Sequence, residues 1–373
     1  MLVSLGVALF ASALICSAIL SILVRRLAPR LGLVDRPGRR KVHHEPMPLG
    51  GGIAIFGTTA GLIVAALVFA IAQAAGGVAS WLPAMLRSQI PLAAERAPVA
   101  FYVLGGGAVI FALGLVDDVR GLPPWVRIAV QAAVAAALYF LSEDLRLTGF
   151  AECPVLPFVY TVLWIVGLTN AFNLLDNMDG LSAGVGVIVS LVFTVVAVLT
   201  EQYFMAATLL VFGGALLGFL GLNFPPASLF MGDAGSMFVG YMLSVVTILF
   251  TFFVPGEDLS PVSALLTPIV VMAVPLYDTI SVVLIRLGEG RPIMTGDKRH
   301  FSHRLVDLGM TPRAAVLTIY LVTLCTGLLA PLLLMVGPAV SWLVLVDVGL
   351  MLVLVWLLEH AGRVGRARER EPL

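Results

Sequence analysis

Charge is scarce in this sequence. Only 12% of its 373 residues are Asp, Glu, Lys or Arg, about half the share typical of a soluble domain. Because 60% of the residues are hydrophobic, nearly all of the chain must face lipid or other helices, which excludes an ordinary soluble protein. The 22 basic and 22 acidic residues balance, so the net charge indicates no particular partner, and we expect none that is a nucleic acid.

Cysteine is scarcer still. The three cysteines, Cys16, Cys153 and Cys325, lie far apart in or near apolar segments. They form none of the close spacings that hold zinc or carry redox chemistry, and we interpret them as packing thiols. The chain also lacks a long polar linker, so we expect one domain over residues 1–373.

Long hydrophobic runs dominate what is present. A membrane-spanning helix needs about 20 apolar residues, and the sequence divides into about eleven such segments. They are 2–24, 51–74, 98–116, 125–142, 156–172, 184–200, 203–222, 234–254, 263–285, 314–336 and 338–360. The first run precedes Arg25 and Arg26, whereas a signal peptide carries its charge before the apolar run, so it is interpreted as a retained helix. We therefore expect an all-α, polytopic membrane bundle.

Basic residues indicate the orientation. They collect in alternate loops, namely 25–41, 117–127, 286–313 and the tail 363–370. The loops on the other side hold only Arg87, Arg96 and Arg146. Because basic loops stay in the cytoplasm, we expect the N-terminus outside and the C-terminus inside.

Nearly every Asp, Asn and His that could carry chemistry falls on the basic side. The first cluster is 39–52, which contains Lys41 and His43 and ends in a Pro- and Gly-rich turn. A membrane anchor at lipid headgroups would explain its cations but not its histidines. The second cluster is Asp117-Asp118 at the end of a span, where carboxylates are costly. A solvated helix end is the plain alternative.

Two further clusters adjoin spans. Asn170, Asn173 and Asp176 recur every three residues before Asp179, which on a helix places the first three along one face. The stretch 223–236 begins with Asn223 and continues through Phe230-Met231-Gly232-Asp233. Glycines beside an Asp let a bulky anion and a metal ion approach closely, whereas an Asp at a helix start can also be only an N-cap.

The fifth cluster, 297–305, lies in the longest inner loop and contains His300, His303 and Arg304. Its adjacent cations would compete with a divalent metal ion, so the cluster suits a diphosphate, or else a basic anchor. Two acids lie within spans. Asp278 could reach the inner clusters, whereas Asp347 has no evident partner, and we assign it no function.

Carboxylates and phosphate-binding cations on an apolar bundle favour phosphoryl transfer at the membrane surface. The expected ion is Mg²⁺, with Mn²⁺ as a substitute, because Mg²⁺ is held by one or two carboxylates plus substrate phosphates. A metal-coupled transporter is the alternative from another class. Transporters place ionisable groups near the midplane and show paired repeats, whereas here the polar clusters lie at the inner boundary and we find no repeat. A scaffold without catalysis would not need five polar inner clusters.

In combination the motifs resemble those of the polyprenyl-phosphate N-acetylhexosamine-1-phosphate transferases (glycosyltransferase family 4), over residues 35–309. The motifs are Lys41-x-His43-x-x-Pro46-x-Pro48-x-x-Gly51-Gly52, Asp117-Asp118, Asn170-x-x-Asn173-x-x-Asp176-x-x-Asp179-Gly180-Leu181, Phe230-Met231-Gly232-Asp233-x-Gly235-Ser236 and the loop with His300. The resemblance implies a magnesium-dependent transferase (EC 2.7.8.-). Such an enzyme moves a sugar 1-phosphate from a UDP-N-acetylhexosamine to undecaprenyl phosphate and releases UMP. This is the first membrane step of a cell-envelope glycan such as lipopolysaccharide O-antigen or teichoic acid.

The resemblance also implies a place and a set of roles. The protein would be a multi-pass protein of a bacterial inner membrane, in contact with membrane lipid, with its active site facing the cytoplasm and the option of a homodimer. The implied catalytic residues are Asp117, Asp118, Asp176, Asp179, His300 and His303. The implied metal ligands are Asp233 and Asp118. The implied nucleotide-sugar ligands are Asn173, Asn223, Phe230, Asp179 and Arg304, and the implied ligands of the lipid phosphate are Lys41 and His43.

The sequence departs from the family pattern in places. Many bacterial members carry His-x-His-His where this chain has His300-Phe301-Ser302-His303, and Asn177 stands where many have Gly. The run 46–52 differs from the Gly-Thr-Pro-Thr-Met-Gly-Gly usual in the branch that uses UDP-MurNAc-pentapeptide. We therefore expect UDP-GlcNAc as the donor and keep the peptidoglycan translocase as the alternative. Direct attack by the lipid phosphate and a route through an aspartyl-phosphate both stay open.

Overall fold

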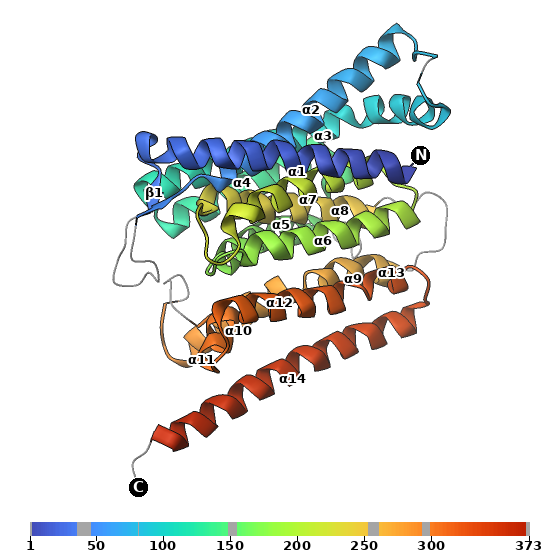
Figure 1. Ribbon diagram of the computed structural model, residues 1–373. Helices are drawn as coiled ribbons and strands as arrows, with labels where there is room; N and C mark the ends of the chain where they lie inside the picture. The colour runs from blue at the N-terminus through green and yellow to red at the C-terminus, as the bar shows by residue number, and fades with distance from the viewer. Residues whose placement is uncertain are drawn as a thin grey trace.

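The computed structural model describes residues 2–35, 46–80, 82–147, 155–252, 261–292 and 299–370. These residues form an almost entirely helical bundle whose long helices run roughly side by side (Figure 1). Within them, ten helices are long and apolar enough to cross a membrane, or up to eleven if a bent pair is one span. The all-α, polytopic fold expected from the sequence is confirmed.

The elements follow the apolar runs of the sequence closely. The long helices are α1 (Leu2–Leu27), α2 (Gly51–Gly76), α3 (Ala84–Arg120), α4 (Pro124–Leu141), α5 (Val155–Leu175), α6 (Leu181–Leu199), α7 (Tyr203–Asn223), α8 (Gly232–Phe252), α9 (Pro261–Val271), α10 (Ala273–Gly288), α12 (Pro312–Gly327) and α14 (Pro338–Arg370). The short elements are β1 (Val34–Asp35), β2 (Met47–Pro48), α11 (Phe301–Asp307), α13 (Ala330–Leu333) and the 3-10 turns Ala28–Leu31 and Glu143–Leu145. The strands β1 and β2 pair antiparallel.

One predicted span is wrong in shape. The segment 263–285 is not a single straight helix, because α9 and α10 meet at a bend of 70°. Pro275 lies in the first turn of α10, and its missing N–H deprives the end of α9 of a helical hydrogen bond. The break at Met272 turns α10 toward the end of the bundle that holds α11.

The two ends of the bundle differ. Figure 1 shows the N-terminus at one end, and β1, α11 and the C-terminal end of α14 at the other. The second end, which carries the basic loops, is called the inner end below. It also holds the ends of α3, α5 and α7 and the start of α8, so all the polar clusters of the described residues gather there.

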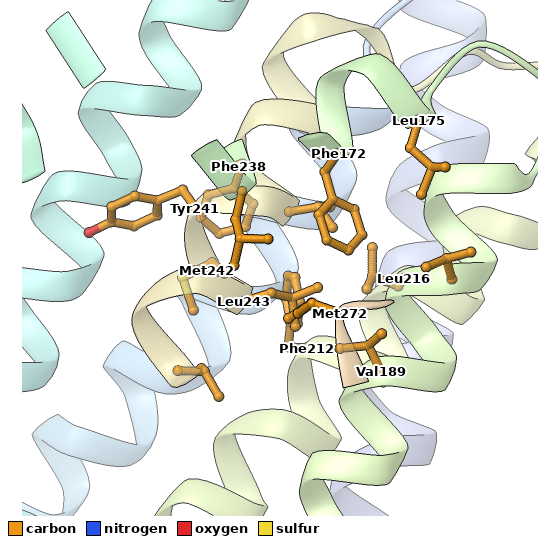
Figure 2. Packing of buried hydrophobic residues seen from close by; sticks show 14 of the residues in the cluster. Phe172, Leu175, Val189, Phe212, Leu216, Phe238, Tyr241, Met242, Leu243 and Met272 are labelled. Carbon is orange, nitrogen blue, oxygen red and sulfur yellow. The ribbon is translucent and has the colours of Figure 1, made fainter. Parts of the chain in front are cut away.

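Helices α6 and α8 form the centre. In the apolar 18-residue stretch of α8 that could cross a membrane, 89% of the residues are buried inside the protein, against 11% in that of α14. Phe172, Phe212 and Phe238, from α5, α7 and α8, are all but fully buried and pack with Tyr241 in one apolar core (Figure 2). A rigid apolar centre therefore lies behind the polar inner end.

Glycines bring some helices into close contact. A Cβ at Gly214 of α7 would meet the Phe10 carbonyl oxygen of α1 at 2.5 Å, and one at Gly218 would collide with the Leu14 carbonyl oxygen. Glycines at helical spacing within an apolar run, here Gly214, Gly218 and Gly221, predict close contacts between helices. That prediction is confirmed for the first two and is wrong for Gly221, which has open space around it.

Candidate active site

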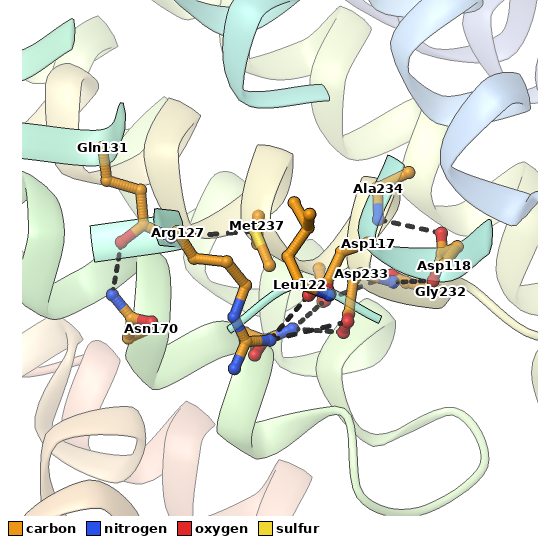
Figure 3. Close-up of polar contacts among 12 residues, drawn as sticks. Asp117, Asp118, Leu122, Arg127, Gln131, Asn170, Gly232, Asp233, Ala234 and Met237 are labelled. Atoms are coloured by element: carbon orange, nitrogen blue, oxygen red, sulfur yellow. Dashed lines mark hydrogen bonds and ion pairs between the residues drawn. The ribbon is translucent and has the colours of Figure 1, made fainter. Parts of the chain in front are cut away.

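The paired carboxylates end α3 beside the start of α8. Asp118 Oδ1 accepts a hydrogen bond from the Asp233 N–H at 2.7 Å, and its Oδ2 accepts one from the Ala234 N–H at 3.2 Å (Figure 3). A carboxylate satisfies the free N–H groups of a helix start and interacts favourably with the helix dipole. The sequence alternative that Asp233 is only an N-cap is wrong in detail, because the capping carboxylate is Asp118.

Close backbone packing makes this contact reachable. A Cβ at Gly114 of α3 would lie 2.5 Å from the Asp233 carbonyl oxygen, and Gly232 has a φ of +75° with the Asp118 carboxylate directly over it. Glycine is the residue that tolerates both conditions. The glycines therefore bring the two acid motifs, 115 residues apart in the chain, into hydrogen-bonding contact.

Arg127 joins Asp117 to Asp233. Its Nη1 lies 2.7 Å from Asp117 Oδ2 and 3.6 Å from Asp233 Oδ2 (Figure 3). The other oxygen of Asp117 accepts a hydrogen bond from the Leu122 N–H at 2.5 Å. Asp117 is nearly buried, with 5% of its side chain exposed, so the guanidinium balances a charge that would be costly alone.

The polar face predicted for 170–176 is present at the end of α5. Asn173 Nδ2 donates to Asp233 Oδ1 at 2.6 Å and to Ser236 Oγ at 3.0 Å. One turn earlier, Asn170 Nδ2 donates to Gln131 Oε1 at 2.6 Å (Figure 3). Asn173 therefore fixes the rotamer of Asp233, so that both Asp233 oxygens have defined neighbours.

Asp176 follows α5 and lies among other acids. Burial raises the pKa of Asp176 well above its usual range, and the nearby carboxylates of Asp233, Asp118 and Asp179 raise it further. With Asp117, five acids lie in this region, and among the described residues Arg127 is the guanidinium that pairs with them. The electrostatic arrangement favours binding of an additional cation.

The turn after α5 is tied to the loop before α8. Asp179 Oδ2 accepts a hydrogen bond from the Ala227 N–H at 2.9 Å. Asn223 is 2% exposed; it accepts from the Gly180 N–H at 3.0 Å and donates to the Leu229 carbonyl at 2.9 Å. Both ends of the Asn223 side chain thus hold loops together, and its contact with a nucleotide stays a prediction.

The first cluster meets the fourth through the backbone. The Phe230 N–H donates to the Pro48 carbonyl, and the Gly51 N–H donates to the Phe230 carbonyl, both at 2.9 Å. The ring of Phe230, the predicted uracil platform, is half-buried at this junction. Lys41 and His43, the predicted ligands of the lipid phosphate, lie outside the described residues.

The histidine cluster is anchored on α10. His300 Nδ1 lies 2.9 Å from Asp278 Oδ2, and the Phe301 N–H donates to Asp278 Oδ1 at 2.6 Å. Ser302 Oγ donates to Asn177 Oδ1 at 2.5 Å. The intramembrane acid Asp278 thus holds the start of α11, as its place in the sequence suggested, and the Ser302 contact links α11 to the motif after α5. His303 is half-buried on the same helix.

Arg304 has a different environment from the one expected. Its guanidinium is buried, with 3% of the residue exposed. Nε donates to Glu359 Oε2 at 2.8 Å, and Nη1 donates to Ser281 Oγ at 3.0 Å and to the Arg299 carbonyl at 2.7 Å. Contacts inside the protein therefore hold Nε and Nη1, whereas Nη2 is buried without a hydrogen-bond partner among the described residues, and the bidentate contact of Arg304 with a diphosphate stays a prediction. The sequence reasoning missed Glu359, whose only signal was a lone acid near the inner end of an apolar run.

The donor set suits an ion that is shared with a substrate. Within the described residues, no group of three or more His, Cys, Asp or Glu side chains is arranged as a metal cage. Mg²⁺ typically takes only one or two carboxylates and completes its octahedron with water and phosphate oxygens. The oxygens of Asp233, with Asp118 and Asp176 close by, fit that arrangement.

Comparisons with known proteins agree with the motifs. The profile described as Glycosyl transferase family 4 matches residues 100–251. The probable undecaprenyl-phosphate N-acetylglucosaminyl 1-phosphate transferase of Bacillus subtilis (strain 168) is 34% identical, covering 84% of this chain and 80% of its own length. The decaprenyl-phosphate N-acetylglucosaminephosphotransferase of Mycobacterium tuberculosis (strain ATCC 25618 / H37Rv) is 35% identical, covering 80% and 75%. The undecaprenyl-phosphate alpha-N-acetylglucosaminyl 1-phosphate transferase of Escherichia coli (strain K12) is 28% identical, covering 82% and 77%.

Proposed function

The chain belongs to glycosyl transferase family 4, the polyprenyl-phosphate N-acetylhexosamine-1-phosphate transferases, and on this premise we propose that it transfers GlcNAc 1-phosphate from UDP-GlcNAc to undecaprenyl phosphate. UMP is the second product. The observation that supports this most directly is the convergence of Asp117, Asp118 and Asp233 with Arg127 at the inner end of an apolar bundle. A lipid phosphate held at the membrane boundary can reach that point.

The proposed reaction is an in-line displacement at phosphorus. An oxygen of the lipid phosphate attacks the β-phosphorus of UDP-GlcNAc, the bond from that phosphorus to the bridging oxygen breaks, and UMP leaves with that oxygen. Asp117 takes the proton of a singly protonated lipid phosphate. Arg127 stands between Asp117 and Asp233 and offers positive charge to the oxygens on which charge develops.

The remaining residues are proposed to bind and orient the metal ion and the UDP-sugar. Asp233 and Asp118 are the proposed ligands of Mg²⁺, which when bound would neutralise phosphate charge and make UMP a better leaving group. Asn173 and Asp179 line the proposed nucleotide pocket, and the half-buried ring of Phe230 is proposed to stack on uracil. His300, oriented by Asp278 at 2.9 Å, and His303 are proposed to face the diphosphate.

The proposal includes a location. The relatives are bacterial, and the chain has multiple apolar helices. We place it in a bacterial inner membrane with the inner end of the bundle in the cytoplasm, where UDP-sugars are made. A homodimer stays a prediction.

Turnover by the purified protein tests the proposal. With Mg²⁺ and undecaprenyl phosphate, UDP-GlcNAc should yield UMP and undecaprenyl-diphosphate-GlcNAc, and faster than UDP-GalNAc, UDP-QuiNAc or UDP-MurNAc-pentapeptide. The absence of UMP with every UDP-N-acetylhexosamine would contradict the transferase function. Direct attack by the lipid phosphate and a route through an aspartyl-phosphate can be distinguished by exchange of labelled UMP into UDP-GlcNAc without lipid acceptor. Only the route through a phospho-enzyme supports that exchange.

A further inference from the structure

The last helix, α14, is mostly exposed, yet it buries one carboxylate. Only 11% of its apolar membrane-crossing stretch is buried inside the protein, the smallest share among the ten candidate spans of the described chain. Glu359, near its inner end, is nevertheless only 1% exposed. Burying an ionised carboxylate is costly unless it is paired. A mostly exposed helix thus carries a buried charged group whose pairing requires α14 to pack in one position.

The partner of Glu359 lies on the histidine-bearing helix. Glu359 Oε2 accepts a hydrogen bond from Arg304 Nε at 2.8 Å and lies 3.4 Å from the Tyr277 hydroxyl. Arg304 is itself 3% exposed, and its Nη1 bonds Ser281 Oγ and the Arg299 carbonyl. The guanidinium is therefore held between α14, α10 and the start of α11.

Helix α11 is tied to the candidate active site by other residues. His300, just before it, contacts Asp278 at 2.9 Å, and Ser302 contacts Asn177 at 2.5 Å. The helix has only seven residues, and so short a helix has little stability of its own. Its orientation therefore depends on these contacts together with the ion pair at Arg304.

We infer that Glu359 is a positioning residue. Through the buried ion pair with Arg304 it holds α11 in the orientation that keeps His300 and Ser302 in contact with Asp278 and Asn177. Removing one partner of a buried pair leaves an uncompensated charge, which favours displacement of the segment that carries it. Glu359 acts through the placement of α11 and its histidine, and the protein itself holds Arg304 Nε and Nη1, so the loss falls on turnover more than on the binding of UDP-GlcNAc. This kinetic consequence rests on the proposed transferase function.

Two substitutions and one control test the inference. Glu359→Gln keeps the shape and removes the charge, and Glu359→Asp keeps the charge and withdraws it by one methylene. The control is Ser341→Ala, also on α14, which removes a buried hydrogen bond of 2.8 Å to Ser263 at the other end of the helix. The control weakens the docking of α14 without touching α11.

Kinetics and hydrogen–deuterium exchange give independent measurements. Glu359→Gln should lower kcat about tenfold or more, because small misplacement of groups near the chemistry costs that much. The KM for UDP-GlcNAc should stay within about threefold, and exchange of amides in 300–308 should accelerate. Glu359→Asp should show the same changes to a smaller degree, and Ser341→Ala should show neither.

The opposite results are equally clear. A monodisperse Glu359→Gln protein with kcat within about twofold of wild type overturns the inference, as does a lowered kcat with unchanged exchange in 300–308. If Glu359→Gln does not fold, Glu359→Asp decides by the same criteria. The exchange measurement needs no turnover. A wild-type protein that released no UMP would refute the proposed function, and exchange in 300–308 would still test whether Glu359 holds α11 in place.

Discussion

The guanidinium of Arg127 on α4 lies 2.7 Å from the carboxylate of Asp117 on α3. The same nitrogen is 3.6 Å from Asp233 on α8, so one side chain connects three helices at the inner end. Asp117 is nearly buried and Arg127 is about one-fifth exposed, which makes this pair far less screened than a surface salt bridge. The pair is thus a structural contact, and its guanidinium is a fixed positive charge beside Asp233, the proposed metal ligand.

Replacement of Arg127 should therefore impair catalysis strongly. We expect Arg127→Ala to reduce UMP release by about 100-fold or more, as loss of a charge aimed at a transition state does elsewhere. Arg127→Lys should retain part of the activity, since it keeps the charge but not the planar fork. The control is Arg120→Ala, an exposed cation at the end of α3, which should leave activity near wild type. Equal rates for Arg127→Ala and Arg120→Ala would contradict the role given to Arg127.

Replacement by Asn should abolish most activity at Asp233 and leave most of it at Asp347. Asp233 accepts from Asn173 at 2.6 Å beside Asp118, whereas Asp347 lies exposed in α14, far along the chain from every cluster. Asp233→Asn removes a charge that the proposed ion needs and should lower UMP release by at least about 100-fold. Asp347→Asn should keep most of the activity. The assay is UMP formed per purified enzyme at saturating substrates, and similar losses in both variants would refute the site assignment.

Asp176 should make stability depend on pH. Burial and the neighbouring acids raise its pKa in the folded protein, so the unfolded chain gives up this proton at a lower pH than the folded one. Its favourable contribution is present below about pH 4, the usual Asp range, and is lost as pH rises through the raised value. In metal-free buffer, the Tm of the Asp176→Asn variant should therefore fall less than the Tm of the wild type as pH rises above about 4.

The control for this measurement is Glu143→Gln, since Glu143 is 89% exposed on the outer side of the bundle. Its Tm should follow the wild-type pH profile. A profile for Asp176→Asn that also matches wild type would show that Asp176 titrates normally in the folded protein.

Two glycines of α3 should respond differently to alanine. At Gly114 a Cβ would lie 2.5 Å from the backbone of α8, whereas at Gly105 nothing lies within 4 Å. Gly114→Ala should destabilise the protein by about 1–3 kcal/mol, as overpacking does, and should lower activity by separating Asp118 from Asp233. Gly105→Ala should cost neither. Thermal unfolding in detergent together with UMP release measures both effects, and an unchanged Tm for Gly114→Ala would contradict the packing argument.

Local sequence patterns were sufficient to predict most of the helices and several of the polar motifs. Each apolar run is helical, although 263–285 is divided into α9 and α10, because a chain with 60% hydrophobic residues can satisfy its backbone in lipid only that way. The three-residue spacing of Asn170, Asn173 and Asp176 placed them near one another, because helical neighbours recur at that spacing. The paired acids and the Gly-rich motif before α8 were also recognisable, since each occupies consecutive positions.

The roles of single polar groups depend on contacts across long distances in the chain. Nothing local distinguishes Arg304 from a phosphate ligand, yet Glu359, 55 residues away, holds it inside the protein. Asn223 likewise bonds Gly180, 43 residues away. The partner of a side chain is set by packing of helices that the sequence pattern does not orient.

Hydropathy and charge act locally, so the amino-acid sequence was enough to predict a polytopic helical membrane protein whose polar clusters collect at one end. Three contacts could be found only in the folded protein: Asp118 caps α8 beside Asp233, Arg127 joins Asp117 to Asp233, and Glu359 ties α14 to α11. Those contacts depend on where glycines allow backbones to approach and where buried charges find partners, and both conditions are properties of the packed bundle.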